Sequence, residues 1–178
     1  MSKKTYSIGP VLLAILAIAV VIESAILIQQ APATQYVPVE RGDPVPDIPI
    51  ALEGFQEVDI TVSPSIIYVT AGCRQIAMAT TSLQTYSIQN GLQGIIDFRP
   101  TSHDIFKDLI ENTGMRVRLA KIETFADSTY YTKLYVQDSA RILALDTRPS
   151  DSIAIAVRLG APIYVADSIL DEAGKDIC

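Results

Sequence analysis

The sequence predicts an α+β fold: a single domain of mixed, mostly antiparallel sheet with packed helices, preceded by one N-terminal transmembrane helix. Several strand-like segments follow one another without helices between them, which argues against a doubly wound parallel sheet. The 178 residues are enough for one core but not comfortably for two. Hydrophobic residues make up 49% of the chain, and their excess lies at the N-terminus.

Residues 8–28 form the predicted transmembrane helix. At about 1.5 Å per residue, this mostly apolar segment reaches about 30 Å, the thickness of a bilayer core. Lys3 and Lys4 precede it, whereas the first basic residue after it is Arg41. The positive-inside rule therefore predicts a single-pass protein of the cell membrane, with residues 1–7 as a cytoplasmic tail and an extracytoplasmic C-terminal domain.

A cleaved signal peptide is the competing interpretation of this segment. Residues 11–22 could be its apolar core, and residues 31–33 (Ala-Pro-Ala) loosely resemble a cleavage site. The membrane anchor is favoured because the apolar run resumes after Glu23, with residues 25–28.

Residues 29–50 are predicted to be an extended linker that leads to the domain at 51–178. The segment has few large apolar residues, and a proline-rich composition favours a semi-rigid spacer. A proline-rich ligand for an aromatic groove is the alternative, but a spacer is favoured directly after a membrane helix. The prolines are Pro32, Pro38, Pro44, Pro46 and Pro49.

Charge and cysteine content limit the partners and the redox chemistry of the chain. With 14 Lys and Arg against 20 Asp and Glu, the net charge is −6. This excludes a polybasic nucleic-acid binder, so a nucleic-acid partner would need a local cationic patch or a bound metal. Cys73 and Cys178 could pair, but the sequence does not decide this. For Cys73, a buried and unreactive thiol is favoured over a reactive one at a helix N-terminus.

The first elements of the domain are predicted to be two strands and a helix. Alternating apolar residues predict strands over 58–62 and 66–69, with a break at residues 63–65 (Ser-Pro-Ser). Residues 74–83 carry apolar side chains at helical spacing, which predicts a helix. Glycines within 91–94 then indicate a loop.

The second half of the domain begins with a predicted helix over 101–112. Its apolar residues recur at helical spacing, Thr101 and Asp104 resemble a capping box, and Gly114 follows its end. Turn residues then separate three strands. The remaining predicted elements are strands over 116–124, 130–136 and 141–146, a helix over 150–158, a strand over 162–165 and a helix over 167–173.

One short pattern occurs twice. Arg99-Pro100-Thr101 and Arg148-Pro149-Ser150 each stand at a predicted helix start. In both, the hydroxyl residue is the predicted N-cap, and Asp104 or Asp151 lies in the first turn, where the helix dipole favours negative charge. Two ordinary helix starts would show the same pattern, so it does not by itself establish a functional pair.

Three longer segments resemble those of a known family. Residues 145–174 read LDTRPSDSIAIAVRLGAPIYVADSILDEAG, and residues 98–117 read FRPTSHDIFKDLIENTGMRV. They resemble the two signatures of the bifunctional nuclease family. FADSTYYTKLYV (125–136) resembles the central hairpin of the family. Together the resemblance covers about residues 57–174. It implies an α+β domain that degrades DNA and RNA, usually with the assistance of a divalent metal.

The resemblance also implies candidate site residues. They are His103, Asp104 and Asp151 for catalysis, Arg99, Arg148 and Ser150 for substrate binding, and Asp104, Asp146 and Asp151 for a metal. Carboxylates suit Mg²⁺ or Mn²⁺, arginines bind phosphate oxygens, and a histidine can transfer a proton near neutral pH. The expected cofactor is therefore Mg²⁺ or Mn²⁺. The expected partners are nucleic acid, the membrane through the N-terminal helix, and further copies of the chain in a homo-oligomer.

Each candidate also has a structural interpretation. Asp146 could pair with Arg148, and Asp104 and Asp151 could be ordinary first-turn acids. A lone histidine in a helix is more often structural than catalytic, and the arginines could simply pair with the aspartates. The family's acid after the second strand is missing, since residues 71–75 read Ala-Gly-Cys-Arg-Gln. Two hypotheses follow: a metal-assisted phosphodiesterase of low sequence specificity, or a non-catalytic anion-binding or assembly module.

Overall fold

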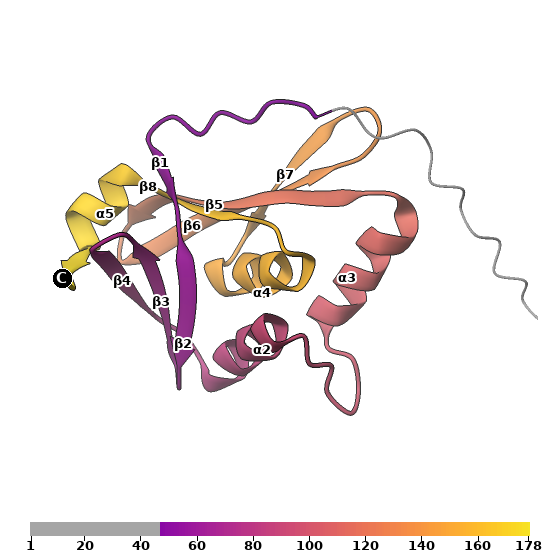
Figure 1. Cartoon of the computed structure of the whole chain (residues 1–178), viewed down its shortest axis with the longest axis horizontal. Coiled ribbons are helices and arrows are strands. Elements are labelled where there is room, and N and C mark those ends of the chain that lie inside the picture. The colour runs from indigo at the N-terminus through magenta and orange to yellow at the C-terminus, as the bar shows by residue number, and fades with distance from the viewer. Residues whose placement is uncertain (1–46) are drawn as a thin grey trace, which may run out of the picture. The chain divides into compact units, whose positions relative to one another are not determined.

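A computed structural model describes residues 47–178, which have an α+β fold (Figure 1). Its strands are β1 (Phe55–Glu57), β2 (Asp59–Ser63), β3 (Ile66–Ala71), β4 (Arg74–Ala79), β5 (Arg116–Ala126), β6 (Thr129–Gln137), β7 (Ile142–Thr147), β8 (Ile163–Ala166) and β9 (Lys175–Asp176). Its helices are α2 (Ser82–Gln93), α3 (Ser102–Thr113), α4 (Pro149–Leu159) and α5 (Asp167–Ala173).

The predicted cytoplasmic tail (1–7), the predicted transmembrane helix (8–28) and most of the predicted linker lie outside the described residues. Within 47–178, no helix has the length and apolar character needed to cross a membrane. The membrane anchor therefore stays a prediction from the sequence.

The described strands form two sheets. One has the order β1-β8-β5-β6-β7, and the other has the order β2-β3-β4-β9. All neighbouring strands are antiparallel except β5 and β8, which are parallel. The predicted α+β class and the mostly antiparallel pairing are thus confirmed, whereas the division into two sheets was not predicted.

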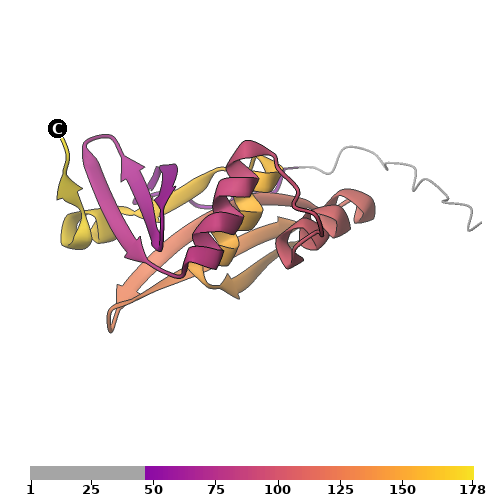
Figure 2. The same cartoon turned by 90° about the horizontal axis from the view of Figure 1, so that it is seen from below.

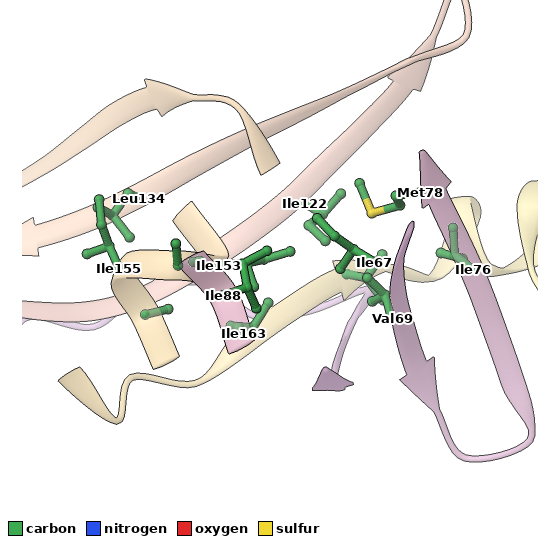
Figure 3. Close-up of a cluster of buried hydrophobic side chains, with 14 of the residues drawn as sticks. Ile67, Val69, Ile76, Met78, Ile88, Ile122, Leu134, Ile153, Ile155 and Ile163 are labelled. Carbon is green, nitrogen blue, oxygen red and sulfur yellow. The ribbon is translucent and has the colours of Figure 1, made fainter. Parts of the chain in front are cut away.

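A shared apolar core joins the two sheets to the helices. β3 contributes Ile67 and Val69, β4 contributes Ile76, β5 contributes Ile122, and α4 contributes Ile153 (Figure 3). Each of these side chains is at most 1% exposed. Because burying such a side chain stabilises a fold by about 1.5–3 kcal/mol, this cluster holds α4 and the two sheets together in one core.

Helix α4 is the centre of the helical layer. It contacts β5 and β6 of the larger sheet and also α2 and α3, and Figures 1 and 2 both show α2 beside it. The approach of α2 is close because Gly91 lies at the contact. A Cβ atom there would be 2.7 Å from Cγ2 of Val157 and 2.8 Å from a guanidinium nitrogen of Arg158. The glycine therefore allows the two helices to meet.

The helix predicted over 74–83 is wrong. Its first part is strand β4, which pairs antiparallel with β3. The side chains of Ile76 and Met78 are buried, whereas Ala77 and Ala79 are exposed, so the apolar pattern has a period of two. Helix α2 follows instead, and it extends into the segment predicted as a glycine loop.

The two Arg-Pro helix starts are built differently. Helix α3 begins as predicted, with Thr101 as its N-cap and Asp104 completing the capping box. Helix α4 does not, because Arg148 is its N-cap and Pro149 is its first residue. Proline favours this position, since the N–H that it lacks would have no partner there. The prediction of Ser150 as the N-cap is wrong: this residue is buried inside the first turn.

The elements predicted after α3 are confirmed. The three predicted strands correspond to β5, β6 and β7, the last strand to β8, and α5 has the predicted bounds 167–173. Asp127 and Ser128 form the turn between β5 and β6 with positive φ angles of 50° and 60°. Aspartate tolerates this backbone conformation better than most residues, which suits it to the turn.

A disulfide joins Cys73 to Cys178, so the pairing that the sequence left open is present. Cys73 is exposed in the turn between β3 and β4, which corrects the prediction of a buried thiol. Cys178 follows β9, which pairs with β4, and the N–H of Ile177 donates to the Cys73 carbonyl at 2.9 Å. The C-terminal end of the chain is thereby fixed to the smaller sheet.

Candidate active site

The two predicted helix starts lie next to each other. Nε2 of His103, in the first turn of α3, is 3.4 Å from Oδ1 of Asp151, in the first turn of α4. Arg148 donates to the same carboxylate, with Nε 2.8 Å from Oδ2 and a terminal nitrogen 3.3 Å from Oδ1. His103, Arg148 and Asp151 therefore form one cluster, which we call the His-Asp-Arg cluster.

The acid and the arginine of this cluster are accessible to solvent. The side chain of Arg148 is 72% exposed and that of Asp151 is 24% exposed, whereas that of His103 is 16% exposed. The hydrogen bond to Asp151 raises the pKa of the Arg148 guanidinium, which keeps it positively charged. Exposed ion pairs are weak, so Arg148 can exchange Asp151 for an incoming anion.

Asp104 is placed in a buried ion pair. Its Oδ1 accepts a hydrogen bond from Nε of Arg158, and its Oδ2 accepts from the backbone N–H and the hydroxyl of Thr101, all at 2.7 Å. The two paired side chains are only 6% and 4% exposed. Burial raises the pKa of Asp104, but the hydrogen bonds and the Arg158 charge outweigh burial and lower it to about 2. With both oxygens occupied, Asp104 has a structural role in this arrangement.

The other predicted site residues are not part of the cluster. Asp146 is exposed in β7, opposite Lys133 of β6. Arg99 is exposed in the loop before α3, and its side chain has no hydrogen-bond or ion-pair partner within 47–178. Ser150 is buried and lines a groove beside Arg148.

The predicted metal ligands do not form a common site. Among the residues that the structure describes, no three Asp, Glu, His or Cys side chains are grouped so that they could hold a metal ion. Asp104 is occupied by Arg158 and Thr101, and Asp146 lies apart in β7. Residues 71–75, where the acid of the family was expected at a helix start, instead contain the turn between β3 and β4. Metal binding therefore stays a prediction.

Two residues behind the cluster were not predicted from the sequence: Ser87, which contacts His103, and Arg158, which contacts Ser87. Oγ of Ser87, on α2, is 2.9 Å from Nδ1 of His103. A terminal nitrogen of Arg158, on α4, donates to the same Oγ at 3.2 Å. Helix α2 was missed because its buried face consists mostly of small and polar residues. Its one clear local signal is the capping box formed by Thr81 and Gln84.

A groove of about 350 Å³ lies beside the cluster. Arg148 and Ser150 line it at the start of α4, Ile67 and Met78 line it from the smaller sheet, and residues 128–130 line it from the hairpin of β5 and β6. A larger groove of about 710 Å³ lies between β2 and the segment before β8, and none of the predicted site residues lines it. The smaller groove is thus the one that an anion bound to Arg148 could enter.

Known proteins share the sequence of this domain. The bifunctional nuclease domain matches residues 50–177. An uncharacterized protein of Mycobacterium tuberculosis is 39% identical over 82 residues, which are 46% of this chain and 48% of that protein. Bifunctional nuclease 2 of Arabidopsis thaliana is 40% identical over 70 residues (38% and 21%), and bifunctional nuclease 1 of Oryza sativa subsp. japonica is 34% identical over 93 residues (51% and 27%). The matches span about half or less of these relatives.

Proposed function

Because the chain belongs to the bifunctional nuclease domain family, we propose that it is a nuclease that hydrolyses phosphodiester bonds of DNA and RNA with low sequence specificity. The observation that carries the proposal is the His-Asp-Arg cluster beside the smaller groove. A guanidinium can bind a phosphate, and a carboxylate or an imidazole can accept a proton from an attacking water. These are the groups that such a hydrolysis needs.

Arg148 binds the phosphate in this proposal. Its planar guanidinium presents paired N–H donors that fit two phosphate oxygens. In the structure these donors face Asp151, so a bound phosphate would compete for them and leave the Asp151 carboxylate free to accept a proton. The local positive charge also offsets part of the repulsion between a phosphate and a chain of net charge −6.

The test uses the purified full chain with fluorescent single-stranded DNA and RNA in the presence of Mg²⁺ or Mn²⁺. Asp151→Asn and Arg148→Ala should each lower kcat/KM by at least about tenfold, because each removes a group that acts on the reacting phosphate. Asp138→Asn is the matched control: Asp138 is also paired with an arginine three residues away, Arg141, but at an exposed turn. Intact substrate after incubation with folded wild-type protein would overturn the proposal.

Mg²⁺ or Mn²⁺ is a proposed cofactor, although the described side chains do not form a metal site by themselves. Mg²⁺ is usually held by one or two carboxylates together with water and substrate phosphates, so the addition of substrate matters for the test. Loss of turnover with EDTA and its return with Mg²⁺ would establish the requirement, and turnover unaffected by EDTA would exclude it.

A non-catalytic anion-binding or assembly module is the second candidate. The observation that favours it is that Asp104 forms a buried ion pair with Arg158. Of the two first-turn acids, Asp151 alone is then accessible. This candidate predicts that the folded chain binds labelled oligonucleotides in an Arg148-dependent manner without cleaving them. Measuring binding and cleavage with the same protein separates the two candidates.

We further propose that the domain lies outside the cytoplasm, on the far side of the cell membrane from residues 1–7. The disulfide between Cys73 and Cys178 supports this placement, because disulfides persist mainly in oxidising compartments. A single membrane anchor at 8–28 would give the same topology. Labelling of residues on the domain by a membrane-impermeant reagent in intact cells tests the placement, and protection from that reagent would contradict it.

A further inference from the structure

A continuous series of side-chain hydrogen bonds lies behind the His-Asp-Arg cluster. It runs from Asp104 through Arg158, Ser87 and His103 to Asp151, with successive distances of 2.7, 3.2, 2.9 and 3.4 Å. Each link joins two different helices among α2, α3 and α4. The series therefore holds the imidazole through both of its ring nitrogens, from α2 at Nδ1 and from α4 at Nε2.

Arg158 and Asp151, which lie on either side of Ser87 and His103 in this series, allow only one direction of hydrogen-bond donation. A guanidinium has donors only, so Arg158 donates to Ser87. An ionised carboxylate has acceptors only, so Asp151 accepts from Nε2 of His103. A neutral imidazole carries one proton, and that proton is then on Nε2, which leaves Nδ1 as an acceptor. The contact of 2.9 Å between Nδ1 and Ser87 therefore requires the hydroxyl to donate.

We infer that Ser87 is a positioning residue, which holds neutral His103 as the tautomer with its proton on Nε2. Both ring nitrogens are then engaged, so the neutral imidazole has no free lone pair with which to accept a proton from water. Asp151 becomes the acceptor, and His103 orients its carboxylate. The catalytic meaning of this inference rests on the proposed function, whereas the tautomer itself is a property of the folded chain alone.

Ser87 acts through His103 and not on the substrate. It is only 7% exposed, and it lines neither of the two grooves described above. Its position depends on the close contact of α2 with α4 at Gly91, one turn further along the same helix. That contact places the guanidinium of Arg158 within reach of the Ser87 hydroxyl.

The composition of the chain makes a direct test simple. His103 is the only histidine, so a tag-free full chain labelled with ¹⁵N-histidine gives one pair of ring-nitrogen signals in an NMR spectrum. The spectrum is recorded at a pH above which the ring-nitrogen signals no longer change, so that the neutral form is observed. In wild-type protein we expect a protonated Nε2 and an unprotonated Nδ1 that accepts a hydrogen bond.

Variants at Ser87 identify the donor. In Ser87→Ala, the chemical shift of Nδ1 should move to that of an unprotonated nitrogen that accepts no hydrogen bond. Ser87→Thr should retain the wild-type chemical shift because it retains the hydroxyl. Ser82→Ala, the same type of change at the exposed start of α2, should leave both signals unchanged. A proton on Nδ1 in wild-type protein would overturn the inference, and so would an unmoved Nδ1 signal in Ser87→Ala.

A kinetic measurement connects the tautomer to catalysis. Ser87→Ala should lower kcat by roughly tenfold, which corresponds to the loss of about one hydrogen bond that orients His103. KM should be nearly unchanged, because Arg148 is not altered. If Ser87→Ala lowered kcat and Ser87→Thr did not restore it, the positioning role would be contradicted. Absence of turnover in wild-type protein would instead overturn the proposed function and would leave the NMR result unaffected.

Discussion

Asp104 and Asp151 show how partners decide the role of an acid. Both lie in the first turn of a helix that begins at or just after an Arg-Pro pair, so the local sequence assigns them the same chemistry. Asp104 is 6% exposed and has partners on both oxygens, whereas Asp151 is 24% exposed beside an exposed arginine. Because burial and neighbouring charges determine how a carboxylate behaves, one acid is structural and the other is accessible.

Removal of Arg158 should destabilise the fold strongly. We expect Arg158→Met to lower the free energy of unfolding by about 3–5 kcal/mol, because it leaves the Asp104 carboxylate buried without its partner. Lys107→Met breaks the exposed pair with Glu111 on α3 and serves as the control, with an expected change within about 0.5 kcal/mol. Urea unfolding followed by circular dichroism measures both. Equal losses in the two variants would contradict a special role for the buried pair.

The low pKa of Asp104 predicts a loss of stability in acid. Its pKa is about 2 in the folded chain, against an ordinary value of 3.8, so the ionised form stabilises the fold. This contribution is present above the unfolded pKa and is lost as the pH falls from about 4 to about 2, and it amounts to about 2 kcal/mol. Between about pH 4 and pH 2, the free energy of unfolding of Asp104→Asn should therefore fall by about 2 kcal/mol less than that of wild-type protein. Parallel pH profiles of urea unfolding would contradict this.

Among the elements, α2 and β4 show what hydrophobic periodicity can and cannot find. The strands and helices after residue 101 have apolar faces, and the sequence predicted them. In β4, the buried Ile76 and Met78 alternate with exposed alanines, and these alanines were mistaken for part of a helical stripe. In α2, the buried face includes Ser87 and Gly91, which carry no hydrophobic signal. Elements that pack through small residues are therefore invisible to such a pattern.

The same reason limits prediction of the site. Arg148, Asp151 and His103 lie in local motifs, and the sequence identified them as candidates. Ser87 reaches His103 only because α2 packs against α4, which is a tertiary contact between distant segments. The pairing of Asp104 with Arg158 is likewise a tertiary contact, and no spacing rule in the sequence predicts it.

The close contact of α2 and α4 gives a prediction with an unusual sign. Gly→Ala inside a helix ordinarily stabilises it by up to about 1 kcal/mol. Here we expect Gly91→Ala to destabilise by about 1–3 kcal/mol, because the new methyl would overlap Val157 and the Arg158 guanidinium. Gln93→Ala, at the exposed end of the same helix, should change stability by no more than about 0.5 kcal/mol. A stabilised Gly91→Ala variant would show that the helices can separate at little cost.

At the scale of the whole molecule, the C-terminal end is fixed to a turn far away in the sequence. Cys73 and Cys178 are separated by 105 residues, and β9 pairs with β4 next to them. Local sequence patterns cannot predict this contact, because β9 is a two-residue strand and neither cysteine lies in a motif. The disulfide encloses most of the domain, including the His-Asp-Arg cluster, in one covalent loop.

Reduction of this disulfide should therefore weaken the whole domain. Closing a loop of about 100 residues removes chain entropy from the unfolded state, which corresponds to about 4–5 kcal/mol in the chain-entropy model and to about 2–5 kcal/mol in practice. We expect the free energy of unfolding to fall by about 2–5 kcal/mol when reductant is added to wild-type protein. The Cys73→Ser, Cys178→Ser double variant should be equally weakened and should not respond to reductant. If wild-type protein were as stable with reductant as without it, the disulfide would contribute little, and its support for an extracytoplasmic domain would weaken as well.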